Sequence, residues 1–290
     1  MRKFLFILAA ILLPILSQAQ TAKPQIDLNT VFVCIDSVTY QKLFENKYLK
    51  DTLFFCRAQA TTTGTGQYAG KYFMGLAATM EFFKPKASQT LGDKYADLGI
   101  EFKTRSTTGL DWYAKYAAKK KLATAIETIT LDDEGKKINW YKQLNIKNDQ
   151  ITSRFVVSIL EYQKEILSMM GFSPKEIASP MTYRQYNEKL SGGRKYPRQF
   201  NTFNEVSITI NSAELAYLKK AMKMIQFSQK GNSFYSDGVV INYKVDEQAT
   251  FRLNAVGISL LNKMPDRDIA ISEKLNVVVR GDKARLVFND

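Results

Sequence analysis

The chain has 290 residues, of which 45% are hydrophobic and 24% are charged, with 41 Lys and Arg against 28 Asp and Glu. This composition predicts a globular protein of one large or two modest domains and excludes intrinsic disorder. The sequence contains no His, which excludes Ser-His-Asp and Cys-His catalysis, His-ligated zinc and a His general base.

The first residues have the charge, apolar core and exit site of a secretory signal peptide. Arg2 and Lys3 precede the apolar run Phe4–Leu16, and the small-x-small site Ser17-Gln18-Ala19 predicts cleavage after Ala19. That run is shorter than the about 20 residues of a membrane-spanning helix, and no Cys stands at the cleavage point for lipid attachment. We expect a periplasmic or secreted mature chain without a transmembrane segment.

The mature chain keeps a basic excess, because removal of Arg2 and Lys3 leaves 39 basic against 28 acidic residues. The excess gathers in three clusters: Lys115/Lys119/Lys120/Lys121, Arg194/Lys195/Arg198 and Lys219/Lys220/Lys223. Such clusters favour anionic surfaces or ligands, or else are solvated faces of helices and loops. Nucleic acid is not expected as a partner, since an exported chain without an aromatic-basic binding motif lacks its usual features.

A strand that runs into a helix cap and an amphipathic helix occurs three times along the chain. The three strands with their caps are Val31–Ile35 with Asp36-Ser37, Leu98–Phe102 with Thr108, and Val206–Ile210 with Asn211. Thr108 precedes a predicted helix at about Leu110–Lys121, and Asn211 forms a capping box with Glu214.

Strand-like stretches follow each predicted helix. They are Leu53–Ala58, Gln67–Gly75 and Thr79–Phe83 after the first, Leu122–Leu131, Ile138–Ile146 and Arg154–Glu161 after the second, and Phe227–Phe234, Gly238–Val245 and Thr250–Leu260 after the third. The sequence thus predicts a βαβββ unit, present twice in succession and then again. A predicted hairpin, Leu275–Arg280 and Ala284–Phe288 around Gly281-Asp282, completes a possible fourth unit whose helix has shrunk.

The segment between Tyr162 and Phe200 breaks this pattern and is predicted to be helical, with Ser173-Pro174-Lys175-Glu176 as a helix start. The expected fold is α+β, with repeated βαβββ units forming a curled mixed sheet. The expected divisions are a signal peptide at 1–19, a double βαβββ domain at 20–162, a helical linker at 163–202 and a related C-terminal domain at 203–290.

Paired βαβββ units are the design of the glyoxalase-like, or vicinal oxygen chelate, superfamily, and the chain resembles an exported bacterial group of unknown function related to it. The resemblance covers most of Leu28–Glu161 and, more loosely, Asn204–Phe288. The residues that carry it are Leu28–Ser37 with Thr39-Tyr40, Tyr68–Tyr72, Thr79–Phe83 and Leu98-Gly99-Ile100. It implies a sheet curled around a concave pocket, with metal ligands on the first and last strands of each unit, often His on the former and Glu on the latter.

Strand alternation, combined with this resemblance, predicts the residues that face the pocket. Glu81 and Glu161 fall at the approximate positions of the superfamily's carboxylate ligands, and Glu101 faces inward on the first strand of the second unit. The pair Trp140-Tyr141 must point one ring into the concavity. The candidate pocket residues are Thr30, Phe32, Cys34, Tyr72, Glu81, Lys103 and Trp140.

Thr30 stands where the superfamily would place a His, so a metal site of mixed His and Glu ligands cannot form. The oxygen ligands that remain are Glu81, Glu101 and Glu161 with Thr30, a set suited to Mg²⁺, Ca²⁺ or Mn²⁺. Alternatively, Glu81 and Glu161 are strand-end residues bonded to Lys, Arg or the backbone. The resemblance also implies that Cys34 and Cys56 lie on separated strands and are free, buried thiols.

The favoured function is therefore binding of a small-molecule or anionic ligand, or of a partner, in the concave pocket, with neither metal catalysis nor a cofactor. One alternative is a metal-assisted isomerase, lyase or hydrolase that uses a carboxylate-bound divalent cation. Another is adhesion to an anionic polymer or surface through the basic clusters. The sequence favours a binding protein over an enzyme and identifies no catalytic residue and no particular ligand.

Overall fold

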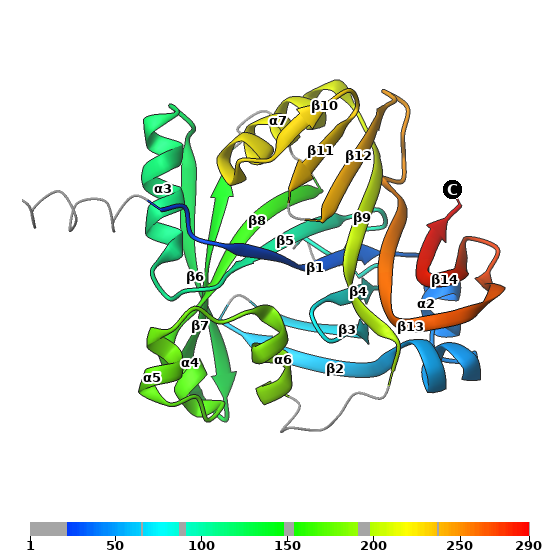
Figure 1. The fold of residues 1–290 in the computed structure, drawn as a ribbon, viewed down its shortest axis with the longest axis horizontal. Helices are drawn as coiled ribbons and strands as arrows, with labels where there is room; N and C mark the ends of the chain where they lie inside the picture. Colours follow the sequence, from blue (N-terminus) through cyan, green and yellow to red (C-terminus); the bar gives the residue numbers. More distant parts are fainter. Residues whose placement is uncertain are drawn as a thin grey trace, which may run out of the picture.

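Strands dominate the chain, whose computed structural model describes residues 22–64, 66–86, 91–147, 154–190, 198–236 and 238–289. The predicted signal peptide lies outside the described residues. Eight strands form a closed barrel (Figure 1): β1 (Ile26–Cys34), β2 (Phe55–Thr63), β3 (Gly66–Met74), β4 (Thr79–Phe83), β5 (Leu98–Thr104), β6 (Thr124–Asp133), β7 (Lys136–Ile146) and β8 (Phe155–Tyr162).

The barrel order is β1-β4-β3-β2-β6-β7-β8-β5. Each half, β1 to β4 and β5 to β8, places its first strand beside its fourth, followed by its third and its second. β1 pairs parallel with β4, β5 pairs parallel with β8, and β1 joins β5 antiparallel. Among the described residues β2 and β6 pair only through Thr63 and Leu131, beside a bond from Gly64 N to Thr130 O at 3.0 Å. The barrel is therefore least tightly closed between β2 and β6.

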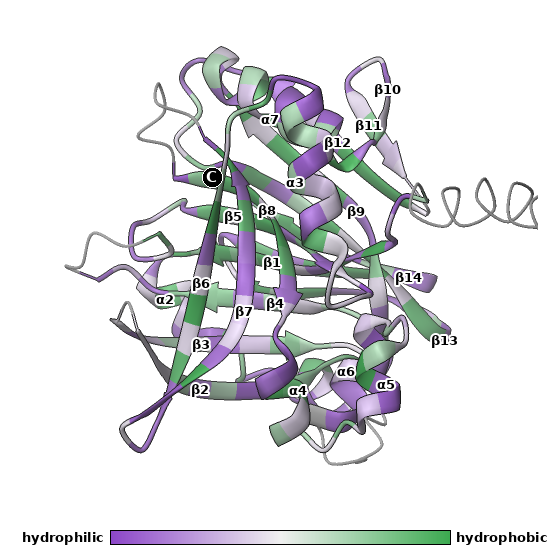
Figure 2. Cartoon of the chain, turned by 90° about the vertical axis from the view of Figure 1, so that its left-hand side faces the viewer, coloured by the Kyte–Doolittle hydropathy of each residue, from purple (hydrophilic) through white to green (hydrophobic). Residues whose placement is uncertain are grey.

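A second sheet of six strands has the order β10-β11-β12-β9-β13-β14. Its strands are β9 (Phe200–Ile210), β10 (Ser228–Lys230), β11 (Ser233–Ser236), β12 (Val239–Val245), β13 (Leu253–Ser272) and β14 (Leu275–Phe288). One continuous hydrophobic core links this sheet to the outside of the barrel. In Figure 2 the strands carry alternating hydrophobic and hydrophilic bands, as expected when the two faces of a strand meet different surroundings.

Two predicted strand details are wrong. Gly281-Asp282 is not a hairpin turn, because β14 runs through it, and the β13–β14 turn falls at Glu273-Lys274. Gly281 has a φ of 58° and pairs with Met264 where the register shifts; it marks a β-bulge, which favours the same left-handed glycine as a tight turn. The stretch Phe227–Phe234 is likewise divided into β10 and β11 by a turn at Gly231.

The helices begin at the predicted caps. Asp36 accepts a hydrogen bond from Thr39 N at 2.9 Å at the start of α2 (Ser37–Lys42), and Asn211 and Glu214 form a capping box on α7 (Ser212–Ile225). A π-helical turn, η1 (Leu49–Leu53), precedes β2. α3 (Gly109–Lys119) covers the second half of the barrel and lies beside α7 (Figure 1). None of the described helices is long and apolar enough to cross a membrane.

The predicted helical segment contains α4 (Lys164–Met169), α5 (Pro174–Ala178) and α6 (Tyr183–Leu190). Ser173 and Glu176 form a capping box at the predicted helix start, with Pro174 in the first turn of α5. The segment forms a second, smaller hydrophobic core with the ends of β7 and β8. It therefore lies across one end of the barrel, as the lower part of Figure 1 shows.

Cys34 and Cys56 are free, as predicted, because β4 and β3 separate β1 from β2 in the sheet. Cys34 is fully buried and Cys56 is half-buried. Burial raises the pKa of both thiols to about 12, so both stay protonated at neutral pH.

Candidate functional site

Strand register defines which side chains face the barrel interior, because directly paired residues point to the same face of a sheet. Phe32 pairs with Glu81 on β4 and with Gly99 on β5, whereas Thr30 pairs with Glu101. The alternate residues of β1, such as Val31, pack in the hydrophobic core outside the barrel. Thr30, Phe32, Glu81 and Glu101 therefore share the interior face.

Glu81 and Glu101 are close enough to repel each other. Burial, and then the charge of Glu101, raises the pKa of Glu81 to about 8, and burial raises the pKa of Glu101 to about 7. Neither carboxyl forms an ion pair with Lys or Arg in the described part of the chain. Both side chains are only half-buried, so solvent reaches them.

Tyrosine and phenylalanine rings surround these two carboxyls. Tyr72 pairs in register with Glu81, and the electrostatic influence of Glu81 and Glu101 reaches Tyr68 on β3 and Tyr141 on β7. These tyrosines and carboxyls belong to β3, β4, β5 and β7, and side chains of these four strands can meet only inside the barrel. Burial raises the pKa of all three tyrosines, which are therefore neutral hydrogen-bonding groups.

Phe83 completes the aromatic lining from β4. Its ring lies 6.0 Å from that of Phe32 and 6.0 Å from that of Tyr68, in edge-to-face geometry. Gly99 and Gly70 leave room for these rings: a Cβ on Gly99 would stand 1.9 Å from the Phe32 ring, and one on Gly70 would stand 2.9 Å from Phe83. The interior is thus partly apolar, with the two carboxyls as its acidic groups.

Two buried polar atoms near this site have no hydrogen-bond partner within the described residues, Ser158 Oγ and Asn29 Oδ1. Ser158 is 0% exposed and pairs in register with Glu101. Buried polar atoms are normally bonded, so each such exception needs an explanation. A ligand or water in the barrel interior would supply the missing partner.

The helical segment closes one end of the interior with aromatic side chains. Tyr183 Oη lies 3.1 Å from Thr79 Oγ1, and the Tyr186 ring stacks on that of Tyr162 at 4.0 Å. Trp140 packs with the same group, and its ring lies 5.0 Å from Tyr141. Of the pair Trp140-Tyr141, Tyr141 is under the electrostatic influence of the carboxyls, whereas Trp140 packs with the aromatic group at the barrel end.

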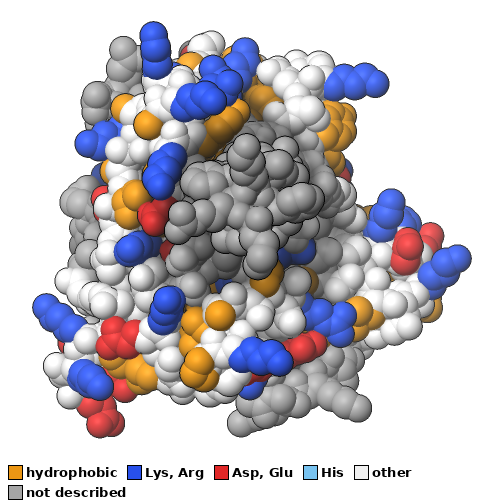
Figure 3. Space-filling model, turned by 60° about the vertical axis from the view of Figure 1, so that its left-hand side comes forward, with side chains coloured by type: hydrophobic (Ala, Val, Ile, Leu, Met, Phe, Trp, Pro, Cys, Tyr) orange, Lys and Arg blue, Asp and Glu red, His pale blue; other side chains and the backbone are white. Residues whose placement is uncertain are grey.

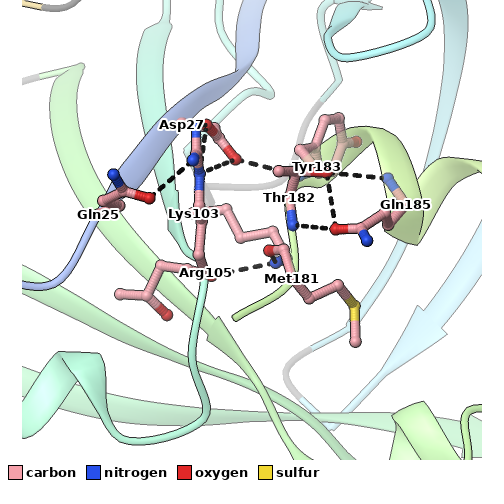
Figure 4. Close-up of polar contacts among 9 residues, drawn as sticks. Gln25, Asp27, Lys103, Arg105, Met181, Thr182, Tyr183 and Gln185 are labelled. Atoms are coloured by element: carbon pink, nitrogen blue, oxygen red, sulfur yellow. Dashed lines mark hydrogen bonds and ion pairs between the residues drawn. The ribbon is translucent and has the colours of Figure 1, made fainter. Parts of the chain in front are cut away.

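Lys103 lies at the same end and joins the helical segment to the barrel (Figure 4). Its Nζ donates to Thr104 O at 3.0 Å and to Met181 O at 3.1 Å, and burial lowers its pKa to about 8. Beside it, Asp27 accepts three bonds from Arg105, the shortest at 2.7 Å, and one from Tyr183 N at 3.0 Å. Lys103 is therefore held by backbone carbonyls and does not neutralise Glu81 or Glu101.

Glu161 does not join the other two carboxyls, contrary to the expected three-carboxylate set. On β8 the interior residues alternate through Ser158 to Tyr162, which pairs with Tyr141, so Glu161 points to the outer face. There its Oε2 accepts a hydrogen bond from Leu110 N at 2.7 Å, in the first turn of α3. Glu161 is thus bonded to the backbone at a helix N-terminus, where a carboxylate is stabilising.

Cys34 lies at the opposite end of the barrel from Lys103. The charges of Asp97 and Asp93 contribute to its raised pKa. Asp97 itself is fully buried and bonded to Arg154 at 2.9 Å. Cys34 therefore belongs to the packing around this ion pair, and its thiol does not approach the carboxyl pair.

The donor set does not fit the metal centre that the superfamily implies. The chain has no His, and the described residues contain no group of three or more His, Cys, Asp or Glu that could hold a metal ion. The interior offers two carboxyls with raised pKa values and neutral phenols. Such a set lacks the ligands of a transition-metal site.

A groove of about 720 Å³ opens elsewhere, on the helical segment. Apolar side chains, including Met170, Phe172 and Met181, line it, and charged residues of α5 and α6 flank it. It contains none of the interior carboxyls. The groove and the carboxyl pair are therefore separate features.

Two of the predicted basic clusters lie on the neighbouring helices α3 and α7. Lys115, Lys119, Lys219, Lys220 and Lys223 are all exposed, as are Lys120 and Lys121 just after α3. Figure 3 shows Lys and Arg side chains gathered on the upper part of one face. In the third cluster, Arg194 and Lys195 lie outside the described residues.

Three solved structures are similar to this chain over most of its length. A hypothetical protein from Staphylococcus aureus has a TM-score of 0.52 at 11% identity, over 85% of this chain and 96% of that chain. Homoprotocatechuate 2,3-dioxygenase from Arthrobacter globiformis has a TM-score of 0.36 at 9% identity, over 78% of this chain and 62% of that chain. A Mn(II)-bound glyoxalase from Novosphingobium aromaticivorans also has a TM-score of 0.36, at 7% identity, over 76% and 62%.

The protein is thus of a sheet-dominated, mixed α+β class. The chain belongs to the family described as Family of unknown function (DUF5829), which matches residues 28–288. A search of curated proteins gives no match. The family match agrees with the predicted family of unknown function, whereas the export of the chain stays a prediction.

Several interior residues escape sequence reasoning. Tyr68 lies four residues before Tyr72 on β3, so strand alternation places both side chains on the same face. This alternation is the sequence signal that could have identified Tyr68. Tyr183 and Tyr186 stand three positions apart in a helix assigned to a linker. Ser158 gave no signal, because its importance comes only from its pairing with Glu101 across two strands.

Proposed function

We propose that this protein binds a small molecule inside the barrel, through Glu81, Glu101 and the surrounding tyrosines, without metal catalysis. The observation that carries the proposal is the pair of interior carboxyls, which have no ion-pair partner among the described residues. A concave, partly apolar site with a few convergent polar groups is typical of small-molecule binding.

The side chains around the pair support a ligand with both apolar surface and hydrogen-bond donors. Phe32 and Phe83 offer apolar walls, and the tyrosine hydroxyls both donate and accept. The carboxyls accept when ionised, and Ser158 Oγ lacks a partner in the described chain. An anionic ligand, one of the two chemistries expected from the sequence, is disfavoured by Glu81 and Glu101.

The architecture that we propose for this function is a repeat of βαβββ units. The equal strand orders of the two barrel halves support it, as does the parallel pairing of β9 with β12, with α7 between them in sequence. In this proposal residues 20–162 are a double unit, 163–202 a helical linker that closes the barrel end, and 203–290 a related C-terminal domain.

The test is retention of small molecules from a cell extract. Purified protein would be incubated with the extract, washed, denatured and analysed by mass spectrometry for released compounds. We expect compounds retained by the wild type and lost in the double variant Glu81→Gln/Glu101→Gln. Glu188→Gln, on the exposed face of α6, is the matched control. Equal retention by the double variant would argue against binding in the barrel.

The metal-assisted alternative needs its own measurement. Metal analysis of protein purified without chelator would detect a stoichiometric divalent ion. Such an ion, lost in Glu81→Gln but kept in Glu161→Gln, would replace the metal-free proposal with a carboxylate-bound Mg²⁺, Ca²⁺ or Mn²⁺.

A second candidate function is adhesion to an anionic polymer. It is supported by the location of two lysine clusters on the adjacent helices α3 and α7. Retention on a polyanion column should fall when Lys219, Lys220 and Lys223 are changed to Gln, and should disappear at moderate salt. Unchanged retention would remove this candidate.

Export is also part of the proposal. The sequence of residues 1–19 supports a cleaved signal peptide and a periplasmic or secreted mature chain. Mass spectrometry of the protein from each cell fraction tests it. A mature chain that begins at Gln20 is expected, and an intact Met1 in the cytoplasmic fraction would contradict it.

A further inference from the structure

We infer that the molecule bound in the barrel is an organic cation of the ammonium class, held between Glu81, Glu101 and the surrounding tyrosine rings. This inference rests on the proposed function, because it names the chemistry of the ligand of the same site.

Four other buried or half-buried carboxylates of the described chain have partners. Asp27 is bonded to Arg105 at 2.7 Å, Asp97 to Arg154 at 2.9 Å and Glu214 to Arg252 at 2.6 Å. Glu161 is bonded instead to a backbone N–H at 2.7 Å. Buried carboxylates generally require such compensation.

Glu81 and Glu101 stand apart from this pattern in a chain with 41 Lys and Arg. Lys103 donates to two backbone carbonyls, and Arg57 is exposed on β2 beside Tyr72. A positively charged ligand would compensate both carboxyls at once. It would also favour their ionised forms, because a nearby opposite charge lowers the pKa of a carboxyl.

The aromatic lining suits the same kind of ligand. Cations bind favourably over the faces of Tyr and Phe rings, because the ring faces carry negative electrostatic potential. Tyr68, Tyr72 and Tyr141 approach the carboxyls from β3 and β7, and Phe32 and Phe83 form an apolar wall beside them. An ammonium group with an apolar substituent can use the carboxyls, the rings and the wall together.

The unpartnered atoms add acceptors for N–H groups. Ser158 Oγ lies in register with Glu101, and Asn29 Oδ1 lies next to Thr30, which pairs with Glu101. A primary or secondary ammonium has two or three N–H donors to distribute among such acceptors. A quaternary ammonium would use the rings and carboxyls alone.

The test compares matched cationic and neutral probes by ligand-observed NMR. The pairs are 2-phenylethylamine with 2-phenylethanol, and choline with its neutral carbon isostere 3,3-dimethyl-1-butanol. We expect the cation of at least one pair to bind at least about tenfold more tightly than its neutral partner. Glu81→Gln and Glu101→Gln should each weaken that cation by about tenfold or more, and Glu161→Gln should leave it unchanged.

A ring test keeps the inference falsifiable if a carboxyl variant misfolds. Tyr141→Phe keeps a ring face and should keep cation binding, whereas Tyr141→Leu should weaken it. Neutral probes that bind as tightly as the cations, and equally in the Gln variants, overturn the cation inference but leave barrel binding intact. Failure of both cations to bind also overturns it, and the extract experiment then decides the proposed function separately. Binding of Mg²⁺, Ca²⁺ or Mn²⁺ that depends on Glu81, without ammonium binding, would replace the organic cation by a metal.

Discussion

Glu81 and Glu101 stand on the two strands that flank β1, Glu81 in register with Phe32 and Glu101 in register with Thr30. Two strand spacings of about 4.8 Å separate their backbones, and the curvature of the barrel turns both side chains to the same interior. The two acids are thus placed by three strands that are not consecutive in the chain. Their mutual repulsion and burial should make the stability of the protein depend on pH.

We predict that the double variant Glu81→Gln/Glu101→Gln is stabilised relative to the wild type as pH rises. The folded pKa values of about 8 and about 7 lie above the ordinary value of 4.5. The folded state therefore binds more protons than the unfolded state between these values, so the wild type loses stability as pH rises through them. Below about pH 4.5 all these carboxyls are protonated and this cost vanishes.

The measurement is urea unfolding of both proteins at several pH values. The stability difference should grow by about 1–3 kcal/mol between about pH 5 and about pH 9; this is less than the full pKa shifts imply, because solvent reaches these half-buried groups. The tyrosines that face the pair, Tyr68, Tyr72, Tyr141 and Tyr183, have raised pKa values and stay neutral in this range. A difference that does not change with pH would contradict the assigned burial of the pair.

Alternation, combined with the resemblance, predicts the inward set on β1 and β5, because Thr30, Phe32 and Glu101 each lie one residue from the core residues Val31 and Ile100. Glu161 was instead assigned by similarity to the superfamily's carboxylate position. A shift of one residue moves a side chain to the other face, and Tyr162, not Glu161, faces inward.

Other features depend on contacts that are distant in the sequence. Tyr183 reaches Thr79, which is 104 positions away, so no local pattern could show that the helical segment closes the barrel. The turn at Gly281 could not be distinguished from a bulge either, because both favour glycine with positive φ. Local periodicity therefore predicts strands, caps and faces, whereas the composition of the interior requires the strand order.

Glu161 should stabilise the start of α3 through its acceptor oxygen more than through its charge. Glu161→Gln keeps an acceptor for Leu110 N and should cost less than about 1 kcal/mol. Glu161→Leu leaves that buried N–H without a partner and should cost about 1–3 kcal/mol. Urea unfolding of the two variants checks this order, and equal losses would show that the hydrogen bond to Leu110 contributes nothing.

Lys103 gives a pH effect of opposite sign to that of the carboxyl pair. Its folded pKa of about 8 lies below the ordinary 10.5, so the folded state binds fewer protons than the unfolded state between these values. The cost of burying the charged amine is present below about pH 8 and disappears as pH rises to about 10.5. Lys103→Met should remove this contribution.

The measurement is the difference in unfolding free energy between wild type and Lys103→Met from about pH 7 to about pH 10. The wild type should gain on the variant across this range. Loss of the bonds to Thr104 O and Met181 O lowers the stability of the variant at every pH, so only the slope tests the shift. Lys189→Met, on the half-exposed face of α6, serves as the control for loss of a lysine charge.

Gly99 should tolerate no side chain while Phe32 keeps its ring position. A Cβ at Gly99 would meet three atoms of that ring at 1.9–2.6 Å, so Gly99→Ala must displace the ring toward Phe83. Overpacking of this kind costs about 1–3 kcal/mol. Phe32→Leu should remove most of the steric conflict, so the double variant Gly99→Ala/Phe32→Leu should lose less stability than the sum of the two single variants.

A double-mutant cycle measured by urea unfolding gives this coupling directly. Additive losses would mean that the Phe32 ring does not occupy the space beside Gly99, and the aromatic wall proposed for the ligand would then lack one of its members.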